Sequence, residues 1–203
     1  MFQDLQSAVV IRFHDASHDA PGWPVAGGRH ADAAVEDPWG WIETNHRYNS
    51  LLWAEEDLAR RKNVPDAEIA ANKRAIDGYN QKRNDATEKT DEAILSRLGA
   101  VAPAADARLS SETAGSMIDR LSIMSLKIRA MREQTLRTDT DAAHLQNCRS
   151  KLDKLLEQRT DLANCLDRLL TEAVAGTAYF KIYRQFKMYN DPKLNPQLYK
   201  NGG

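Results

Sequence analysis

Cysteine is scarce in this chain, with two residues among 203. Cys148 and Cys165 fall within one predicted helix, where a rise of about 1.5 Å per residue places them roughly 25 Å apart, beyond the reach of a disulfide. A disulfide framework is therefore excluded as the basis of the fold. Both residues are expected to be free thiols that pack as small apolar side chains in a reducing cytoplasm.

The chain also has almost no net charge and no long apolar run. Its formal net charge of −1 at pH 7 gives no bulk attraction to nucleic acid or to an anionic membrane. No apolar run approaches the ~18 residues of a membrane span, and the first residues, MFQDLQSAVVIRF, lack the basic n-region of a signal peptide. The sequence therefore predicts a cytoplasmic protein with neither a nucleic-acid partner nor a membrane span.

Strand-like alternation is missing, and apolar side chains recur at helical spacing instead. The expected helices cover residues 3–13, 41–62, 65–98, 110–137, 138–176 and 179–186. Ser110 or Ser111 is expected to cap the fourth of these, and Thr138-x-x-Asp141 resembles a capping box for the fifth. The predicted fold is all-α, an up-down helical bundle of four long helices with short terminal helices and an extended C-terminal tail. Residues 1–40 are expected to form a short helix plus a flexible loop, and residues 41–203 a single helical-bundle domain with that tail.

The loop expected from residue 14 to residue 40 contains a pair of histidines. His14 and His18 have the i, i+4 spacing that would place two metal ligands on one face of a helix. The Pro21-Gly22 pair that follows argues against a helix here and favours a mobile loop. No metal site is therefore predicted.

Polar residues form a stripe on each of the two helices expected between residues 41 and 98. At 100° per residue, each stripe covers about 80–100° of its helix, so the two together predict a polar groove between neighbouring helices. The first stripe comprises His46, Asn49, Trp53, Glu56, Asp57 and Arg60. The second comprises Lys73, Asp77, Asn80, Asn84, Glu88 and Asp91.

An antiparallel turn near residue 63 brings one set of these residues to the same level. His46 would face Asn80 to Asn84, and Asn49 would face Asp77 to Asn80, with open space between them for a ligand. In this prediction His46 is the catalytic acid/base or phosphate contact and Asp77 orients it. The expected ligand-binding residues are Asn49, Asn80 and Asn84 for hydroxyl groups, and Arg83 and Lys127 for anionic charge.

A second set is expected to be a structural ion network. Arg159 interrupts a leucine-rich stripe on residues 138–176, and a buried guanidinium requires a carboxylate partner. The network is expected to comprise Glu88, Asp91, Asp119, Arg120 and Arg159, with a supporting pair formed by Glu56 and Lys73. The acidic pairs Glu56-Asp57 and Glu88-x-x-Asp91 resemble those of helical magnesium-dependent pyrophosphatases, but a simple hairpin separates them by about 25 Å, which argues against that activity.

The helix expected at residues 110–137 also carries residues with a packing role. Met117, Leu121, Met124 and Ile128 are expected to lie in the core. Gly115 is expected to allow a close backbone approach between two helices. Neither feature requires a ligand.

Four spaced segments resemble a bacterial family known as domain of unknown function 4254. They read NHRYNSLLWAEEDLAR, KRAIDGYNQKRND, SETAGSMIDRLSIMSLKI and KMYNDPKLNPQLY, and the likeness extends from about Trp41 to Tyr199. Members of this family tend to be encoded near envelope glycosyltransferases. The resemblance therefore implies a role in envelope glycan metabolism.

Two functions of different classes follow from these observations. The first is binding or processing of a phosphorylated sugar or related glycan precursor in the polar groove, with the cofactor unknown. The alternative is a non-catalytic partner of a glycosyltransferase, whose tail docks on that partner or across a homodimer through Tyr189, Leu194 and Tyr199. The same tail would have no such function if it wraps its own bundle.

Overall fold

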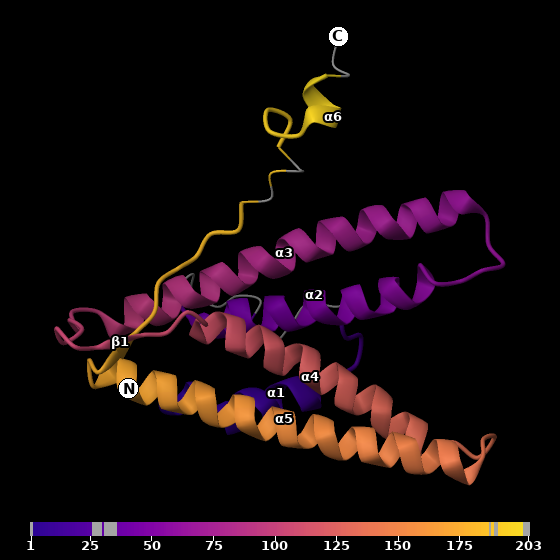
Figure 1. The fold of residues 1–203 in the computed structure, drawn as a ribbon, viewed down its shortest axis with the longest axis horizontal. Coiled ribbons are helices and arrows are strands. Elements are labelled where there is room, and N and C mark those ends of the chain that lie inside the picture. Colours follow the sequence, from indigo (N-terminus) through magenta and orange to yellow (C-terminus); the bar gives the residue numbers. More distant parts are fainter. Residues whose placement is uncertain (1, 26–29, 31–35, 187, 189–190, 201–203) are drawn as a thin grey trace.

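Four long helices form two antiparallel hairpins in the computed structural model, which describes residues 2–25, 30, 36–186, 188 and 191–200 (Figure 1). The first hairpin comprises α2 (Pro38–Leu58) and α3 (Asp66–Leu98), and the second α4 (Ala114–Thr135) and α5 (Ala142–Val174). The hairpins meet near the link between α3 and α4 and splay apart toward their turns (Figure 1). The expected all-α bundle is confirmed, in the form of two diverging hairpins.

Side chains cap the first turns of α2, α4 and α5. Asp37 accepts a hydrogen bond from the Trp39 amide, and Pro38 occupies the first turn of α2, where its missing N–H costs nothing. Thr113 and Ser116 form a reciprocal capping box on α4, so the expectation of a cap at Ser110 or Ser111 was wrong. Asp141 itself caps α5 by accepting from the His144 amide, in place of the predicted box from Thr138.

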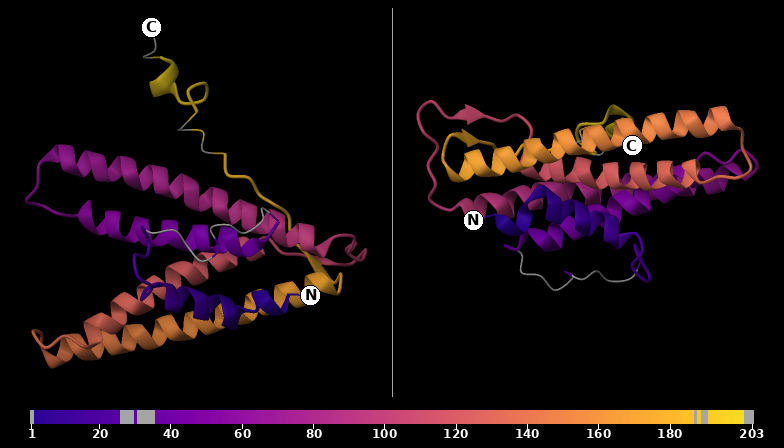
Figure 2. Two further views of the ribbon diagram at one scale, coloured as in Figure 1. Left: turned by 180° about the vertical axis from the view of Figure 1, so that it is seen from behind. Right: turned by 90° about the horizontal axis from the view of Figure 1, so that it is seen from below.

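The N-terminal segment belongs to the same hydrophobic core as the bundle. A short 3-10 helix (η1, Gln3–Leu5) leads into α1 (Ser7–Ser17), which lies against α4 and α5 (Figure 2). Phe2, Leu5 and Val10 are buried in the core. The loop expected to start at residue 14 was placed too early, because the helix continues through His14 to Ser17. The expected loop's residues 26–29 and 31–35 lie outside the described residues.

The centre of the core is formed by apolar residues from all of the long helices. Its fully buried members include Ile42, Ile94, Ile118, Leu121, Leu166 and Leu169. Gly115 on α4 lies so close to α3 that an added Cβ would stand 2.6 Å from the Thr87 carbonyl oxygen. The predicted close approach at this glycine is confirmed.

The chain after α5 does not form the helix expected at residues 179–186. Gly176, at φ 72°, turns the chain, and β2 (Ala178–Tyr179) then pairs in parallel with β1 (Arg108–Leu109). Backbone hydrogen bonds from Arg108 and Ser110 to residues 177 and 179 commit this backbone to an extended form. The aromatic spacing was therefore misread as helical.

Beyond β2 the chain runs away from the bundle to a short helix, α6 (Pro196–Tyr199) (Figure 1). Arg184 ties its first part to α3 through Glu88 and Glu92. Tyr189 of the expected docking tail lies outside the described residues. Within the described ranges, every helix is too short or too polar to cross a membrane.

Candidate functional site

His46 lies in a buried cluster and not in a groove beside Asn80 and Asn84. Its side chain is fully buried, with Nδ1 2.8 Å from the Ser122 Oγ and Nε2 3.1 Å from the His14 carbonyl oxygen. Trp23 stacks on the imidazole at a centroid distance of 5.1 Å. The predicted position of His46 was wrong, because α1 and the segment after it cover this face of α2.

The hydrogen bonds of His46 define its protonation. A carbonyl oxygen can only accept, so Nε2 carries the hydrogen, and Nδ1 of the neutral ring accepts from the Ser122 hydroxyl. Burial lowers the pKa of His46 well below its usual value, and the neighbouring His14 and His18 lower it further. His46 is thus a neutral structural side chain, with neither ring nitrogen available to a ligand.

A network of amides and hydroxyls surrounds Asp119 where α2, α3 and α4 meet. The amide nitrogens of Asn45 and Asn49 lie 2.8 and 2.9 Å from the Asp119 Oδ1. Asn49 also donates to the Ser122 Oγ at 3.0 Å, which links this network to His46. Sequence reasoning missed Asn45, although its position one turn before Asn49 places both amides on one face of α2.

Arg83 reaches this network from α3 with part of its hydrogen-bonding capacity unused. Its Nη2 donates to the Asn84 Oδ1 at 2.9 Å, and its Nη1 lies 3.8 Å from the Asp119 Oδ2, longer than a hydrogen bond. Its Nε is buried without a partner among the described residues. Asn84 is itself buried, so it supports Arg83 from behind and does not line the groove.

A groove with two adjoining segments runs from the space where α2 and α3 face α4 to the space between α4 and α5. The amide segment has a volume of about 520 Å³ and includes four of the residues expected to be catalytic or ligand-binding: Asn49, Asp77, Asn80 and Arg83. The remaining residues that line it are Leu52, Trp53, Glu56, Asp57, Arg60, Lys73, Ile76, Ile123 and Leu126. The two stripes of the sequence therefore do form a polar groove, but His46, Asn84, Glu88 and Asp91 do not line it.

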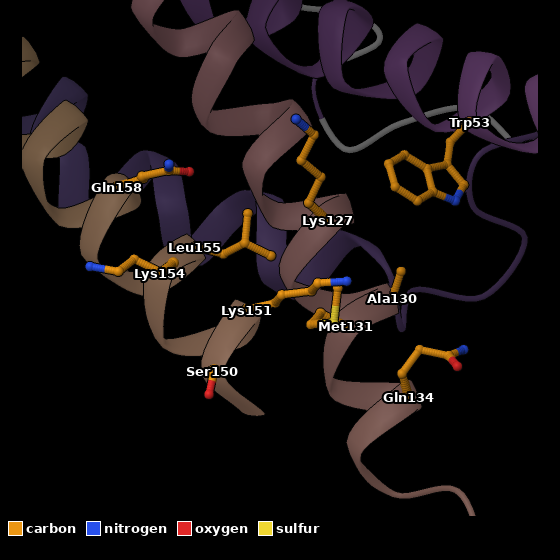
Figure 3. Close-up of a pocket in the computed structure, with 10 residues that line it drawn as sticks. All are labelled: Trp53, Lys127, Ala130, Met131, Gln134, Ser150, Lys151, Lys154, Leu155 and Gln158. Atoms are coloured by element: carbon orange, nitrogen blue, oxygen red, sulfur yellow. The ribbon is translucent and has the colours of Figure 1, made fainter. Parts of the chain in front are cut away.

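The apolar segment adjoins it through Trp53, which lines both (Figure 3). This segment has a volume of about 630 Å³ between α4 and α5. Its lining comprises Trp53, Lys127, Ala130, Met131, Gln134, Ser150, Lys151, Lys154, Leu155 and Gln158. Lys127, which was expected beside Asn84, lines this segment and not the amide segment.

A family model described as a protein of unknown function, DUF4254, matches residues 39–182. The chain belongs to the DUF4254 family. The matched region begins in the first turn of α2 and ends just beyond β2, so it contains both segments of the groove. It leaves out α1 and the residue after it, which supply His14 and His18 to the buried cluster around His46. No curated protein and no solved structure matches the chain.

Glu88 and Asp91 do not pair with Arg120 or Arg159 as expected. Asp91 accepts a hydrogen bond from the Gly115 amide at 2.6 Å, and Glu88 pairs with Arg184 of the tail. Burial raises the pKa of Asp91 to about 6, while hydrogen bonds from Thr113 and Gly115 oppose that rise. Because Gly115 packs closely against α3, its backbone N–H reaches Asp91 and takes the place of the expected arginine.

The two arginines of the expected network have other partners. Arg159 pairs with Asp15 of α1 at 2.9 Å. The reason is that α1 covers the face of α5 that was expected to lie beside Asp91 and Asp119. Arg120 pairs with Glu112, just before α4. Asp119 lies in the central network, where its partners are the amides of Asn45 and Asn49 and, at 3.8 Å, the guanidinium of Arg83.

The expected pair of Glu56 with Lys73 is not formed either. Glu56 pairs with Arg60 on its own helix, and Lys73 pairs with Asp77 at 2.7 Å. All four side chains are substantially exposed at the rim of the amide segment. Pairs of this kind contribute little to stability, roughly 0.3–0.5 kcal/mol each. Asp77 does not orient His46 as expected, since no hydrogen bond joins the two among the described residues.

The spacing of His14 and His18 raised the possibility of a metal site, and both rings lie beside His46 in the buried cluster. No group of three or more His, Cys, Asp or Glu side chains in the described ranges is arranged to hold a metal ion. His14 is fully buried in α1, and neither of its ring nitrogens has a partner among the described residues. Burial, with a smaller effect of His18, lowers the pKa of His14 to about 3.

Proposed function

We propose that the amide segment of the groove binds a phosphorylated sugar or a related glycan precursor. One observation carries the proposal: an incompletely paired guanidinium, two amides and an indole line a single groove of about 520 Å³. That volume lies within the ~300–1,000 Å³ typical of small-molecule sites. In line with the family resemblance, the proposal places this binding in envelope polysaccharide metabolism.

Each of the four side chains has a defined role in this proposal. The guanidinium of Arg83 binds the phosphate, since its only ion pair among the described residues is a long one, 3.8 Å from Nη1 to the Asp119 Oδ2. Asn80 is half-buried without a hydrogen bond to any described residue, and it is available to a sugar hydroxyl. Asn49 donates through its amide nitrogen to the network, which leaves its Oδ1 to accept from a hydroxyl. Trp53 offers an apolar face to the sugar ring.

The charged residues at the rim do not compete with Arg83 for the phosphate. Arg60 is paired with Glu56, and Lys73 is paired with Asp77. These pairs balance one another in charge, so the proposal assigns anion recognition to Arg83. His46 and Asp77 have no catalytic role in it, and the proposed activity is binding.

Calorimetric titration of the full chain with glucose 1-phosphate tests the proposal, with glucose and inorganic phosphate as separate titrants. Binding of the sugar phosphate is expected, and Arg83→Gln is expected to weaken it tenfold or more, about 1.4 kcal/mol. Arg74→Gln is the matched control, because Arg74 is an exposed arginine on α3 outside the groove.

Asn80→Ala provides a second variant, in case Arg83→Gln disturbs the Asp119 network. It removes an amide without hydrogen bonds to any described residue, so its thermal unfolding should match that of the unmodified chain. Equal affinity in the unmodified chain and in both groove variants would contradict the proposal. Failure of the unmodified chain to bind any hexose 1-phosphate in a panel would do so too.

A second candidate function, binding to a partner protein, is favoured by the C-terminal segment. Its exposed large apolar side chains include Tyr183, Phe186, Met188, Leu194, Leu198 and Tyr199. The segment extends away from the helices that could cover it (Figure 1). We propose a glycosyltransferase as this partner, following the family resemblance. Co-elution of an envelope glycosyltransferase with the full chain, and its loss on Phe186→Ser with Leu198→Ser, would support this function, whereas equal co-elution would contradict it.

A further inference from the structure

The apolar segment of the groove has the composition of a site for an alkyl chain. Ala130 and Met131 of α4, Leu155 of α5 and Trp53 of α2 form its half-buried surface. Figure 3 shows Met131 and Leu155 between the two helices, with the indole of Trp53 reaching toward them from α2. Ligand sites are mostly apolar, with a few polar groups that fix orientation, and the volume of about 630 Å³ suits a small molecule.

Two lysines supply positive charge beside this apolar surface. Neither Lys127 nor Lys151 has an ion-pair partner among the described residues, although both line the segment. Figure 3 shows the Lys151 side chain extending from α5 across Met131 toward α4. Two unpaired ammonium groups beside an apolar groove are complementary to an anionic head group attached to an alkyl chain.

Lys154 is an internal comparison on the same wall. It lines the segment too, but its Nζ lies 2.8 Å from a Glu157 carboxylate oxygen, so its charge is locally balanced. Figure 3 shows its side chain directed away from Trp53 and Lys127. The charge available to a ligand therefore comes from Lys127 and Lys151.

We propose that the apolar segment binds a single-chain anionic amphiphile. The alkyl chain lies along Met131 and Leu155, and the carboxylate or phosphate head pairs with Lys127 and Lys151. This site is separate from the sugar-phosphate site in the amide segment, which is centred on Arg83, and it does not depend on that proposal. The two sites meet at Trp53.

Decyl phosphate and decanoate, each below its critical micelle concentration, are the probes for calorimetric titration of the full chain. Saturable binding of one molecule per chain is expected for at least one of them, and the tighter probe identifies a lipid phosphate or a fatty acid as the source of the head group. Butyl phosphate is expected to bind at least tenfold more weakly, because its chain is too short to cover the apolar surface.

The variants separate the contribution of charge from that of the apolar surface. The double variant Lys127→Gln, Lys151→Gln is expected to weaken binding of the charged probes tenfold or more, while Lys154→Gln leaves it unchanged. Leu155→Gln is expected to weaken binding without changing the two lysines. Arg83→Gln is expected to leave decyl phosphate binding unchanged, so failure here is distinguishable from failure of the sugar-phosphate proposal.

Three results would overturn the proposal. The first is that neither probe binds below its micelle concentration. The second is an equal loss of affinity in Lys154→Gln and in the double variant, which would show non-specific attraction to lysines. The third is a dimer in light scattering that dissociates in Leu155→Gln, which would show that a second copy of the chain covers this surface.

Discussion

His14 is expected to make the folded protein sensitive to mild acid. Its imidazole is fully buried, and burial holds its pKa at about 3 against the ordinary value of 6.5. The unfolded chain therefore binds a proton below pH 6.5, whereas the folded chain binds one only near pH 3. Between these values the unfolded state takes up more protons, so the free energy of unfolding falls as the pH falls.

The size of this effect follows from the two pKa values. Between pH 7 and pH 5, a shift from 6.5 to about 3 removes about 2 kcal/mol from the free energy of unfolding. Burial also lowers the pKa of His18 and of His46, which act in the same direction. Asp91 opposes them, because its pKa is raised to about 6, and it stabilises the folded chain by roughly 1 kcal/mol over the same interval.

The variant His14→Leu isolates the contribution of His14. It removes two ring nitrogens that have no partner among the described residues, while the backbone carbonyl that accepts from His46 remains. The variant is expected to be more stable than the unmodified chain by about 1–3 kcal/mol at pH 7. At pH 5 that advantage should grow by a further 2 kcal/mol or so, since leucine does not titrate.

Urea denaturation at pH 7, 6 and 5 measures both quantities. His144→Gln is the matched control, because it removes a histidine from α5 outside the buried cluster. If His14→Leu loses as much stability between pH 7 and pH 5 as the unmodified chain, then His14 is not the buried, neutral group that makes the folded protein sensitive to acid.

Three further variants test the packing described above. Gly115→Ala should lower the free energy of unfolding in urea by about 1–3 kcal/mol, because its Cβ would stand 2.6 Å from the Thr87 carbonyl oxygen. Gly78→Ala should raise that free energy by about 0.5–1 kcal/mol, because nothing lies within 4 Å of the added Cβ. Asp91→Asn should stabilise the chain at pH 7 by up to about 3 kcal/mol, since the raised carboxyl pKa costs stability above pH 6; equal gains at pH 4 and pH 7 would contradict this. His46→Ala should cost about 2–5 kcal/mol by leaving a cavity under the buried ring, and an unchanged melting temperature would contradict it.

Helical periodicity predicted part of the groove that α2 and α3 line, but it also assigned His46 and Asn84 to it wrongly. Asn49, Asp77, Asn80 and Arg83 line it, because side chains spaced three and four apart point the same way on any helix. These four residues could therefore be assigned to one groove without knowing how the hairpins cross.

The partners of His46 and Arg159 could not be predicted in this way. Both face α1, whose glycine- and proline-rich continuation was interpreted as a loop beginning at His14. The predicted antiparallel register then placed His46 opposite α3 and Arg159 beside Asp91 and Asp119. The actual partners, the His14 carbonyl and the Asp15 carboxylate, come from the four residues by which α1 extends beyond the expected helix end at residue 13.

The divergence of the two hairpins explains why a groove exists at all. Near the crossing, α4 presents Gly115, Ser122 and Ser125 to its neighbours, and these small side chains let the hairpins approach closely. Toward the turns, the facing residues are large, with Trp53 on one hairpin and Met131 on the other. Because large side chains hold the helices apart while the crossing is pinned by Asp119 and its amides, the space opens on the side of Trp53. The same residues that fix the fold thereby place a polar segment beside an apolar one, which is why the two proposed sites take ligands of different chemistry although they meet at Trp53.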